Sequence, residues 1–454
     1  MDREQRRRLL SEAAERGIRY LEGLADRPVF PEAGSIARLE AALQGPLSDG
    51  PTAPSEVLAL IDGLGSPATV ASAGGRYFGF VTGGALPASV AANWLAGAWD
   101  QNSFSFTSSP AAALFEEAAL RWLKDALRLP RGAEGALVTG ATMANFTCLA
   151  AARHHVLERA GWDVESRGLF GAPEVTVIVG QEVHATVRKV LAMLGLGGDR
   201  AVPVPVDAQG RMRADLVPEI SGPTILCLQA GNVSSGAFDP APAIIPGAKA
   251  RGAWVHVDGA FGLWARASDR RAPLAEGFEG ADSWATDAHK WLNVPYDCGA
   301  AFVAAAQALR AAMSVSGSYL LLGGQRDAID VTPDSSRRAR AIEVWAALKS
   351  LGRAGLAELV DRNCRQAEWL AGKLAAAGVE VLNEVALNQA VVAFGDDVRT
   401  DAVIRAIQAS GRIWCGGTTW RGRRAMRISI SSWATTQADL DAALDAILLA
   451  HRAP

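Results

Sequence analysis

Long apolar runs are absent from this chain of 454 residues. No stretch of 18 consecutive apolar residues occurs, and the first residues show no basic region followed by an apolar core, so we expect neither a membrane span nor a signal peptide. A large excess of one charge is also missing, because 45 basic residues face 48 acidic ones. The one basic cluster, REQRRR at 3–8, is typical of the solvated start of a helix. We therefore expect no nucleic-acid partner and no membrane partner.

Cysteine, histidine and tyrosine are all scarce. An odd number of widely spaced cysteines fits neither a disulfide framework nor a CxxC metal site, and we expect reduced thiols in a cytoplasmic protein. The six histidines include no pair at i,i+4 beside a carboxylate, so a zinc enzyme is not expected. The five cysteines are Cys148, Cys227, Cys298, Cys364 and Cys415.

The apolar pattern predicts an α/β architecture with flanking segments. Residues 114–129 have a strongly amphipathic helical pattern, and short apolar runs then alternate with turns and helical stretches. Such alternation predicts a central, mostly parallel sheet covered by helices on both faces. We expect a helical N-terminal segment at 1–66, a large domain at 67–318, and a mobile loop with a small C-terminal α/β domain at 319–454. The predicted strands lie at 136–138, 175–180, 224–231, 253–260, 283–290 and 299–305.

Reactive side chains fall at the ends of these predicted strands. His184 follows one strand, Asp258 ends another, and His289 and Lys290 end a third. The turn at 140–142 opens a helix, and its small residues would let backbone N–H groups approach an anion. Taken one at a time, these residues have structural explanations: a helix cap, a core residue or a tight turn. Because the carboxyl ends of parallel strands form the binding crevice, we expect these residues to share one site.

This combination is what pyridoxal phosphate requires. A lysine amine forms a Schiff base with its aldehyde, and a carboxylate pairs with the pyridine nitrogen. A flat side chain stacks on the ring, and a helix N-terminus holds the phosphate. We therefore predict that Lys290 is placed in an interior setting to act as a nucleophile.

Five sequence blocks then resemble one family, the group II pyridoxal-phosphate-dependent amino acid decarboxylases. The resemblance runs from about residue 73 to the last helix and implies a fold-type I transferase fold. Its most specific part is HVDGA at 256–260 followed by DAHKW at 287–291. The other blocks are EVHAT at 182–186, GNVSSGAFDP at 231–240 and SRRARAIEVWAALKSLG at 336–352.

The resemblance also implies roles for single residues. Lys290 corresponds to the Schiff-base lysine, Asp258 to the carboxylate at the pyridine nitrogen, and His184 to the histidine that stacks on the ring. In this family the site forms at the interface of a homodimer, so part of it would come from a second copy. Further cofactor contacts are implied for Gly140, Ala141, Thr142, Asn232, Asp287 and His289, and substrate contacts for Tyr77 and Phe78.

The chain departs from the family in its loop near 321–337, where aromatic amino acid decarboxylases carry a tyrosine that protonates Cα. None of the four tyrosines lies there, although Tyr319 comes just before it. Either His184 or Tyr319 donates the proton, or His184 only stacks, or the product is an aldehyde made by oxidative deamination.

We predict decarboxylation of an L-amino acid, aromatic or hydrophobic by preference. An acidic substrate would need an arginine such as Arg76 or one from 421–424. The alternatives are an aldehyde synthase that uses O₂, another lyase or aminotransferase on this fold, and an inactive homologue that only binds partners.

Overall fold

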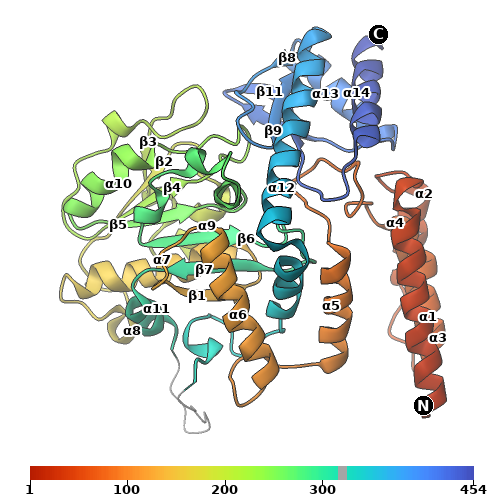
Figure 1. Cartoon of the computed structure of the whole chain (residues 1–454), viewed down its shortest axis with the longest axis horizontal. Coiled ribbons are helices and arrows are strands. Elements are labelled where there is room, and N and C mark those ends of the chain that lie inside the picture. The colour runs from red at the N-terminus through yellow and green to blue at the C-terminus, as the bar shows by residue number, and fades with distance from the viewer. Residues whose placement is uncertain (315–324, 454) are drawn as a thin grey trace.

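A seven-stranded sheet forms the centre of the large domain (Figure 1). The structure, a computed structural model, describes residues 1–314 and 325–453. The strand order is β1-β7-β6-β5-β4-β2-β3, and only β7 runs antiparallel to its neighbours. The predicted, mostly parallel sheet is therefore present. Its strands are β1 Glu134–Val138, β2 Thr176–Gly180, β3 Val202–Val204, β4 Thr224–Gln229, β5 Trp254–Asp258, β6 Ser283–Asp287 and β7 Gly299–Val303.

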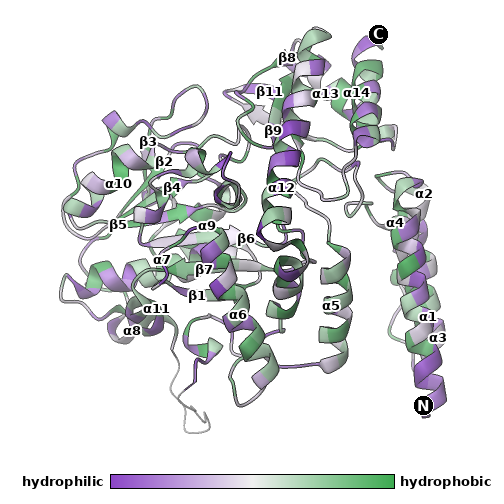
Figure 2. Cartoon of the chain, in the orientation of Figure 1, coloured by the Kyte–Doolittle hydropathy of each residue, from purple (hydrophilic) through white to green (hydrophobic). Residues whose placement is uncertain are grey.

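Helices cover both faces of this sheet, as the alternating strand residues require. Leu137 of β1 points into one apolar core, with α6, α10 and α12, whereas Ala136 and Val138 point into the other, with α7, α9 and α11. Figure 2 shows the strands as the apolar centre between these layers. The helices of this domain are α5 Pro87–Trp99, α6 Pro110–Ala126, α7 Ala141–Glu158, α8 Val164–Arg167, α9 Ala185–Met193, α10 Ala241–Ala250, α11 Ala306–Met313 and α12 Ala341–Ala376.

Two helix boundaries show how local chemistry shifts the predicted elements. The helix predicted at 114–129 starts one turn earlier, because the Ser109 side chain accepts a hydrogen bond from the Ala112 N–H and Pro110 occupies the first helical position. The long helix α12 consists of two helical parts, because it is interrupted at Gly352, whose φ of 61° is left-handed.

A smaller antiparallel sheet, in the order β10-β11-β9-β8, forms the C-terminal domain. The second half of α12 packs with α13 and α14 against it around a separate apolar core. Its elements are β8 Glu380–Val381, β9 Gln389–Ala393, α13 Asp397–Ala409, β10 Gly416–Trp420, β11 Arg423–Ser429 and α14 Gln437–Arg452.

The N-terminal helices stand beside these domains (Figure 1). None of the side chains of α1 is buried, and the segment is held mainly through loops, such as the Val29 N–H donating to the Gly411 carbonyl. Within the part of the chain that the structure describes, no helix is long and apolar enough to cross a membrane. These helices are α1 Arg3–Glu22, α2 Ala33–Leu43, α3 Pro54–Leu60 and α4 Ser66–Ala68.

The described part of the loop predicted to be mobile is packed into the large domain. Arg337 is buried and donates to Glu116 at 2.7 Å, and Arg326 donates to Glu134 at 3.0 Å. Removing one partner of such a buried ion pair is costly, which ties 326–337 to the sheet. Tyr319, the other candidate proton donor, lies outside the described residues.

Candidate active site

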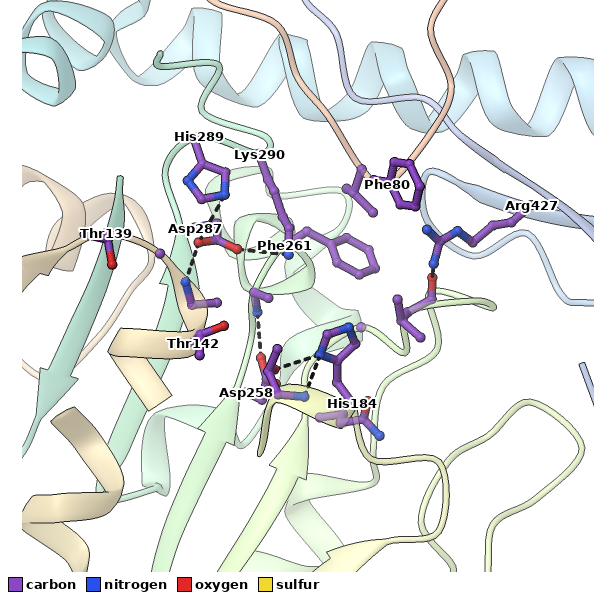
Figure 3. A pocket seen from close by; sticks show the side chains of 18 residues that line it. Phe80, Thr139, Thr142, His184, Asp258, Phe261, Asp287, His289, Lys290 and Arg427 are labelled. Atoms are coloured by element: carbon purple, nitrogen blue, oxygen red, sulfur yellow. Dashed lines mark hydrogen bonds and ion pairs between the residues drawn. The ribbon is translucent and has the colours of Figure 1, made fainter. Parts of the chain in front are cut away.

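A cavity of about 410 Å³ opens where five strands of the large sheet end (Figure 3). The segments after β1, β2, β4, β5 and β6 line it, as expected for the carboxyl edge of a parallel sheet. The 79–82 loop and β11 close it from the other side. The lining residues are Phe80, Val81, Thr139, Gly140, Ala141, Thr142, His184, Thr186, Gln229, Gly231, Val233, Asp258, Ala260, Phe261, Asp287, His289, Lys290 and Arg427.

Lys290 reaches this cavity from the turn after β6. Its Nζ lies 2.9 Å from an Asp287 carboxylate oxygen, and the other oxygen of Asp287 lies 3.5 Å from His289 Nε2. The Cys298 N–H donates to His289 Nδ1, and burial lowers the pKa of His289. The neutral imidazole therefore carries its proton on Nε2, facing Asp287. The DAHK turn thus presents an amine whose charge is balanced by a buried carboxylate.

Asp258 ends β5 and faces the cavity beneath Lys290 (Figure 3). Its residue exposure is 6%. The Ala260 N–H donates to one carboxylate oxygen at 3.2 Å, and the Asn145 side chain donates to the other at 3.3 Å. A buried carboxylate needs such donors or a cation, so the cavity side is suited to a positively charged or protonated group.

His184 is the N-cap of α9, and its ring is oriented by that cap. The backbone N–H of Thr186 donates to Nδ1 at 3.3 Å, and the Thr186 hydroxyl lies 2.7 Å from the same nitrogen. Burial lowers the pKa of His184. The neutral ring therefore keeps its proton on Nε2, and a neutral imidazole N–H is a poor acid. This geometry favours the stacking role over the role of proton donor.

The turn at 140–142, where the sequence predicts an anion site, forms the N-terminus of α7. The Ala141 N–H donates to Asp287 at 2.5 Å, and the Thr139 and Thr142 side chains lie along the same side of the cavity (Figure 3). A Cβ atom on Gly140 would lie 3.1 Å from the His289 ring, so a larger residue would narrow this end. Small residues at a helix N-terminus are what a phosphate group requires.

Three of the predicted site residues do not line the cavity. Phe78 is 1% exposed and packs in the core of the C-terminal domain, whereas Tyr77 stacks on Trp414 with ring centroids 5.1 Å apart. Asn232 uses its side-chain oxygen to accept hydrogen bonds from the Ser234 and Ser235 N–H groups. Tyr77 and Phe78, for which substrate contacts are predicted, therefore do not line the cavity of this chain, and Asn232 stabilises a turn next to that cavity.

Three side chains that the sequence analysis did not single out line the cavity, namely those of Phe80, Phe261 and Arg427. Phe80 and Phe261 give the cavity an aromatic side, and Arg427 reaches in from β11 (Figure 3). Arg427 donates to the Val233 carbonyl at 2.8 Å, and the described residues offer it no carboxylate within ion-pair distance. Burial lowers the pKa of Arg427. The sequence contained one signal for Arg427: it is the only charged residue in the run AMRISIS at 425–431.

The predicted arginines for an acidic substrate are used elsewhere. Arg76 donates to the backbone carbonyls of Ala25, Arg27 and Arg412. Arg423 and Arg424 pair with carboxylates of the C-terminal domain. None of the arginines at 76 and 421–424 lines the cavity.

These residues fit pyridoxal phosphate. An amine, a buried carboxylate with one side open, a neutral imidazole and a helix N-terminus lie around one cavity, as the four parts of the cofactor require. A metal site is not indicated, because the described residues contain no group of three or more histidine, cysteine and acidic side chains able to hold an ion.

Comparisons with known proteins agree with this assignment. A family model described as the pyridoxal-dependent decarboxylase conserved domain matches residues 73–395. The acidic amino acid decarboxylase GADL1 of Bos taurus is 28% identical over 312 residues, which is 65% of this chain and 58% of that protein. This chain thus spans less than two thirds of that relative. The L-2,4-diaminobutyrate decarboxylase of Rhizobium meliloti (strain 1021) is 29% identical over 370 residues, or 78% of this chain and 70% of that protein.

Solved structures share the fold over nearly the whole chain. The structure of Oryza sativa TDC with PLP and tryptamine has a TM-score of 0.89 and 22% sequence identity. The match covers 99% of this chain and 98% of the rice protein. The predicted fold-type I architecture is thereby confirmed.

Proposed function

Because this chain belongs to the pyridoxal-dependent decarboxylase family, as its motifs predict, we propose that it converts an L-amino acid to an amine and CO₂. The family's cofactor is pyridoxal 5'-phosphate. The observation that carries the proposal is the meeting of Lys290, Asp258 and His184 around one cavity. A binding protein without activity would not need a buried carboxylate and an amine placed in this way.

Each residue has a task that follows from its place. When bound, pyridoxal phosphate supplies an aldehyde for the amine and a ring that takes up the electrons of the bond broken at Cα. Lys290 Nζ would be the amine that holds the aldehyde group. Asp258 would keep a proton on the ring nitrogen, and the N-terminus of α7 would bind the phosphate.

The proton that replaces CO₂ at Cα must come from a nearby acid. His184 is neutral, with Nδ1 occupied by Thr186, and is poorly suited to this task. Lys290 Nζ lies on the cavity, 2.9 Å from the Asp287 carboxylate, and is an amine that would be able to hold and deliver a proton there. We assign the proton transfer to Lys290 in place of the missing loop tyrosine.

The shape of the cavity favours an aromatic or hydrophobic substrate. Phe80 and Phe261 provide an apolar side, next to Val81. Phe80 and Val81 have left-handed φ angles of 51° and 58°, which are uncommon for such residues and cluster at functional sites. Arg427 supports a second candidate, an acidic amino acid, because an arginine without a carboxylate partner can bind one from the substrate.

The test is to load the protein with pyridoxal phosphate, incubate it with single L-amino acids and identify products by mass spectrometry. We expect CO₂ and the amine from at least one aromatic, hydrophobic or acidic amino acid. An aldehyde as main product under air would contradict the proton transfer from Lys290. Absence of any product, together with unaltered absorbance of the cofactor, would contradict the proposed function.

Arg427→Met is expected to raise KM for the substrate about 10- to 100-fold, since a hydrogen bond to a charged group contributes about 1.5–3 kcal/mol. If Arg427 binds a side-chain carboxylate, we expect kcat to change less than KM, because an interaction that is equal in the ground and transition states affects binding alone. Arg424→Met is the matched control, as Arg424 pairs with Asp401 outside the cavity. An unchanged KM would rule out contact between Arg427 and the substrate.

The affinity for the amine product then tells which carboxylate Arg427 binds. The amine keeps a side-chain carboxylate but has lost the α-carboxylate. If Arg427→Met weakens product inhibition as much as it raises KM, Arg427 binds the side chain and the acidic candidate is favoured. If product inhibition is unchanged, Arg427 binds the α-carboxylate and the aromatic or hydrophobic candidate is favoured.

We also propose that the protein works as a homodimer with a shared active site. Leu10 and Ile18 on α1 are 62% and 47% exposed, and Phe80 is 64% exposed although it lines the cavity. Such apolar side chains indicate a surface that a second copy covers. In Figure 2, apolar and polar residues alternate along α1.

Light scattering at micromolar concentration is expected to give twice the chain mass of 47.6 kDa. Leu10→Glu combined with Ile18→Glu should shift the mass toward the monomer, because charges at an apolar interface are costly. Glu4→Lys, at an exposed position on the same helix, is the control for α1 itself. A stable monomer that binds the cofactor normally would contradict the proposal.

A further inference from the structure

A line of buried polar side chains runs under the cavity and ends on Asp258. Trp254, His256 and Asp258 alternate along β5 and so share one face, and the strand register places Ser283 of β6 opposite His256. Asn145 faces them from α7, which packs on both strands. His256, Asn145 and Ser283 are completely buried. Polar groups at such depth must satisfy one another.

The hydrogen bonds along this line are continuous. The Trp254 indole N–H donates to Ser283 Oγ at 2.9 Å, and Ser283 Oγ lies 2.9 Å from His256 Nδ1. His256 Nε2 lies 2.8 Å from the side-chain oxygen of Asn145, whose nitrogen donates to Asp258 at 3.3 Å. Four contacts therefore connect an indole to the carboxylate at the cavity.

The chemistry of the groups leaves one consistent direction for the protons. An indole only donates, so the Ser283 hydroxyl accepts from it and gives its own proton to His256 Nδ1. A carboxylate only accepts, so Asn145 turns its nitrogen to Asp258 and its oxygen to His256. His256 must then be neutral, with its proton on Nε2. Burial agrees with this, since it lowers the pKa of His256 to about 3.

We propose that His256 is a positioning residue, which through Asn145 fixes the orientation of the Asp258 carboxylate toward the cofactor's ring nitrogen. Without the proton on His256 Nε2, the Asn145 side chain could turn its oxygen toward the carboxylate, and Asp258 would lose a donor. The α7 helix would thus contribute to cofactor binding twice. Its N-terminus would bind the phosphate, and its Asn145 would orient Asp258. This inference rests on the proposed function, because it assumes the role of Asp258.

The first test needs no cofactor. In protein labelled with ¹⁵N in histidine, the His256 ring is expected to show a neutral imidazole with its proton on Nε2, unchanged between pH 6 and 8. His256→Gln identifies the signal, and if that variant does not fold, single variants of the other five histidines identify it by elimination. A charged ring, or a proton on Nδ1, would overturn the proposal even if no variant of the line folds.

The second test uses the holoenzyme and three variants. His256→Gln and Asn145→Ala are expected to lower kcat about 3- to 10-fold with little change in KM, as loss of one buried hydrogen bond predicts. Both should shift the pH midpoint of the cofactor's visible absorbance, which a purely structural role would leave unchanged. The losses should not add in the double variant, because both act through one contact. His155→Gln is the matched control, since His155 lies against the same Trp254 ring but outside the line.

Asp258→Asn distinguishes the positioning role of His256 from the proposed function itself. If Asp258→Asn abolishes turnover and His256→Gln changes neither kcat nor the absorbance midpoint, the positioning role is wrong and the proposed function stands. If Asp258→Asn is itself fully active, the role of Asp258 in the proposed function fails. We expect His256→Gln to add little to the loss caused by Asp258→Asn.

Discussion

Lys290→Ala is expected to abolish turnover, with a loss of at least ~10³-fold, while the fold and the dimer remain. In the proposed function, Lys290 is both the amine that holds the cofactor's aldehyde and the proton donor, and an acid–base role alone contributes roughly 10²–10⁴-fold. Its side chain is 21% exposed on the cavity, so alanine leaves no void in the core. Circular dichroism and light scattering should match the wild type.

The decisive measurement is covalent labelling. After borohydride treatment, mass spectrometry of the wild-type protein should find the reduced cofactor on the peptide that contains Lys290. The variant should carry none. Lys189→Ala, at an exposed position on α9, is the control and should be labelled like the wild type. A normal borohydride-sensitive absorbance band in Lys290→Ala would exclude Lys290 as the attachment point.

Asp258→Asn is expected to lower kcat at least ~10²-fold, with a much smaller effect on cofactor affinity. Asparagine keeps the size, but it removes the charge that stabilises a protonated ring nitrogen. It can also accept from only one of the Asn145 side chain and the Ala260 N–H, because these donate to different oxygens of Asp258. Loss of one electrostatic partner of a transition state costs about 10²–10³-fold in kcat. Single-turnover kinetics and a cofactor titration measure the two effects separately.

Asp239→Asn distinguishes this loss from a general effect of removing a buried carboxylate. Asp239 is buried and accepts hydrogen bonds from the Met212 and Gln229 N–H groups at 2.7 Å, and it does not line the cavity. Its substitution should lower thermal stability and leave kcat per loaded site nearly unchanged. If Asp258→Asn and Asp239→Asn lower kcat equally, the role of Asp258 at the ring nitrogen is not supported.

The sequence by itself determined the sheet and much of the cavity. Short apolar runs predicted the strands, and the residues after them had to meet at the carboxyl edge of a parallel sheet. This reasoning brought together Lys290, Asp258, His184 and the turn at 140–142, which the structure places around one cavity. It succeeded because each of these residues lies within a few positions of a strand end, where local pattern decides position.

The tertiary structure alone decided the side of the cavity that faces the substrate. Tyr77 and Phe80 lie three positions apart, yet Tyr77 stacks on Trp414 and Phe80 lines the cavity. Arg427 enters from another domain, and its role depends on how that domain sits on the large sheet. The His256–Asn145 contact likewise joins a strand to a helix far away in the chain. Periodicity along the chain fixes which face a residue occupies, whereas its partner across the interior is set by packing between distant segments.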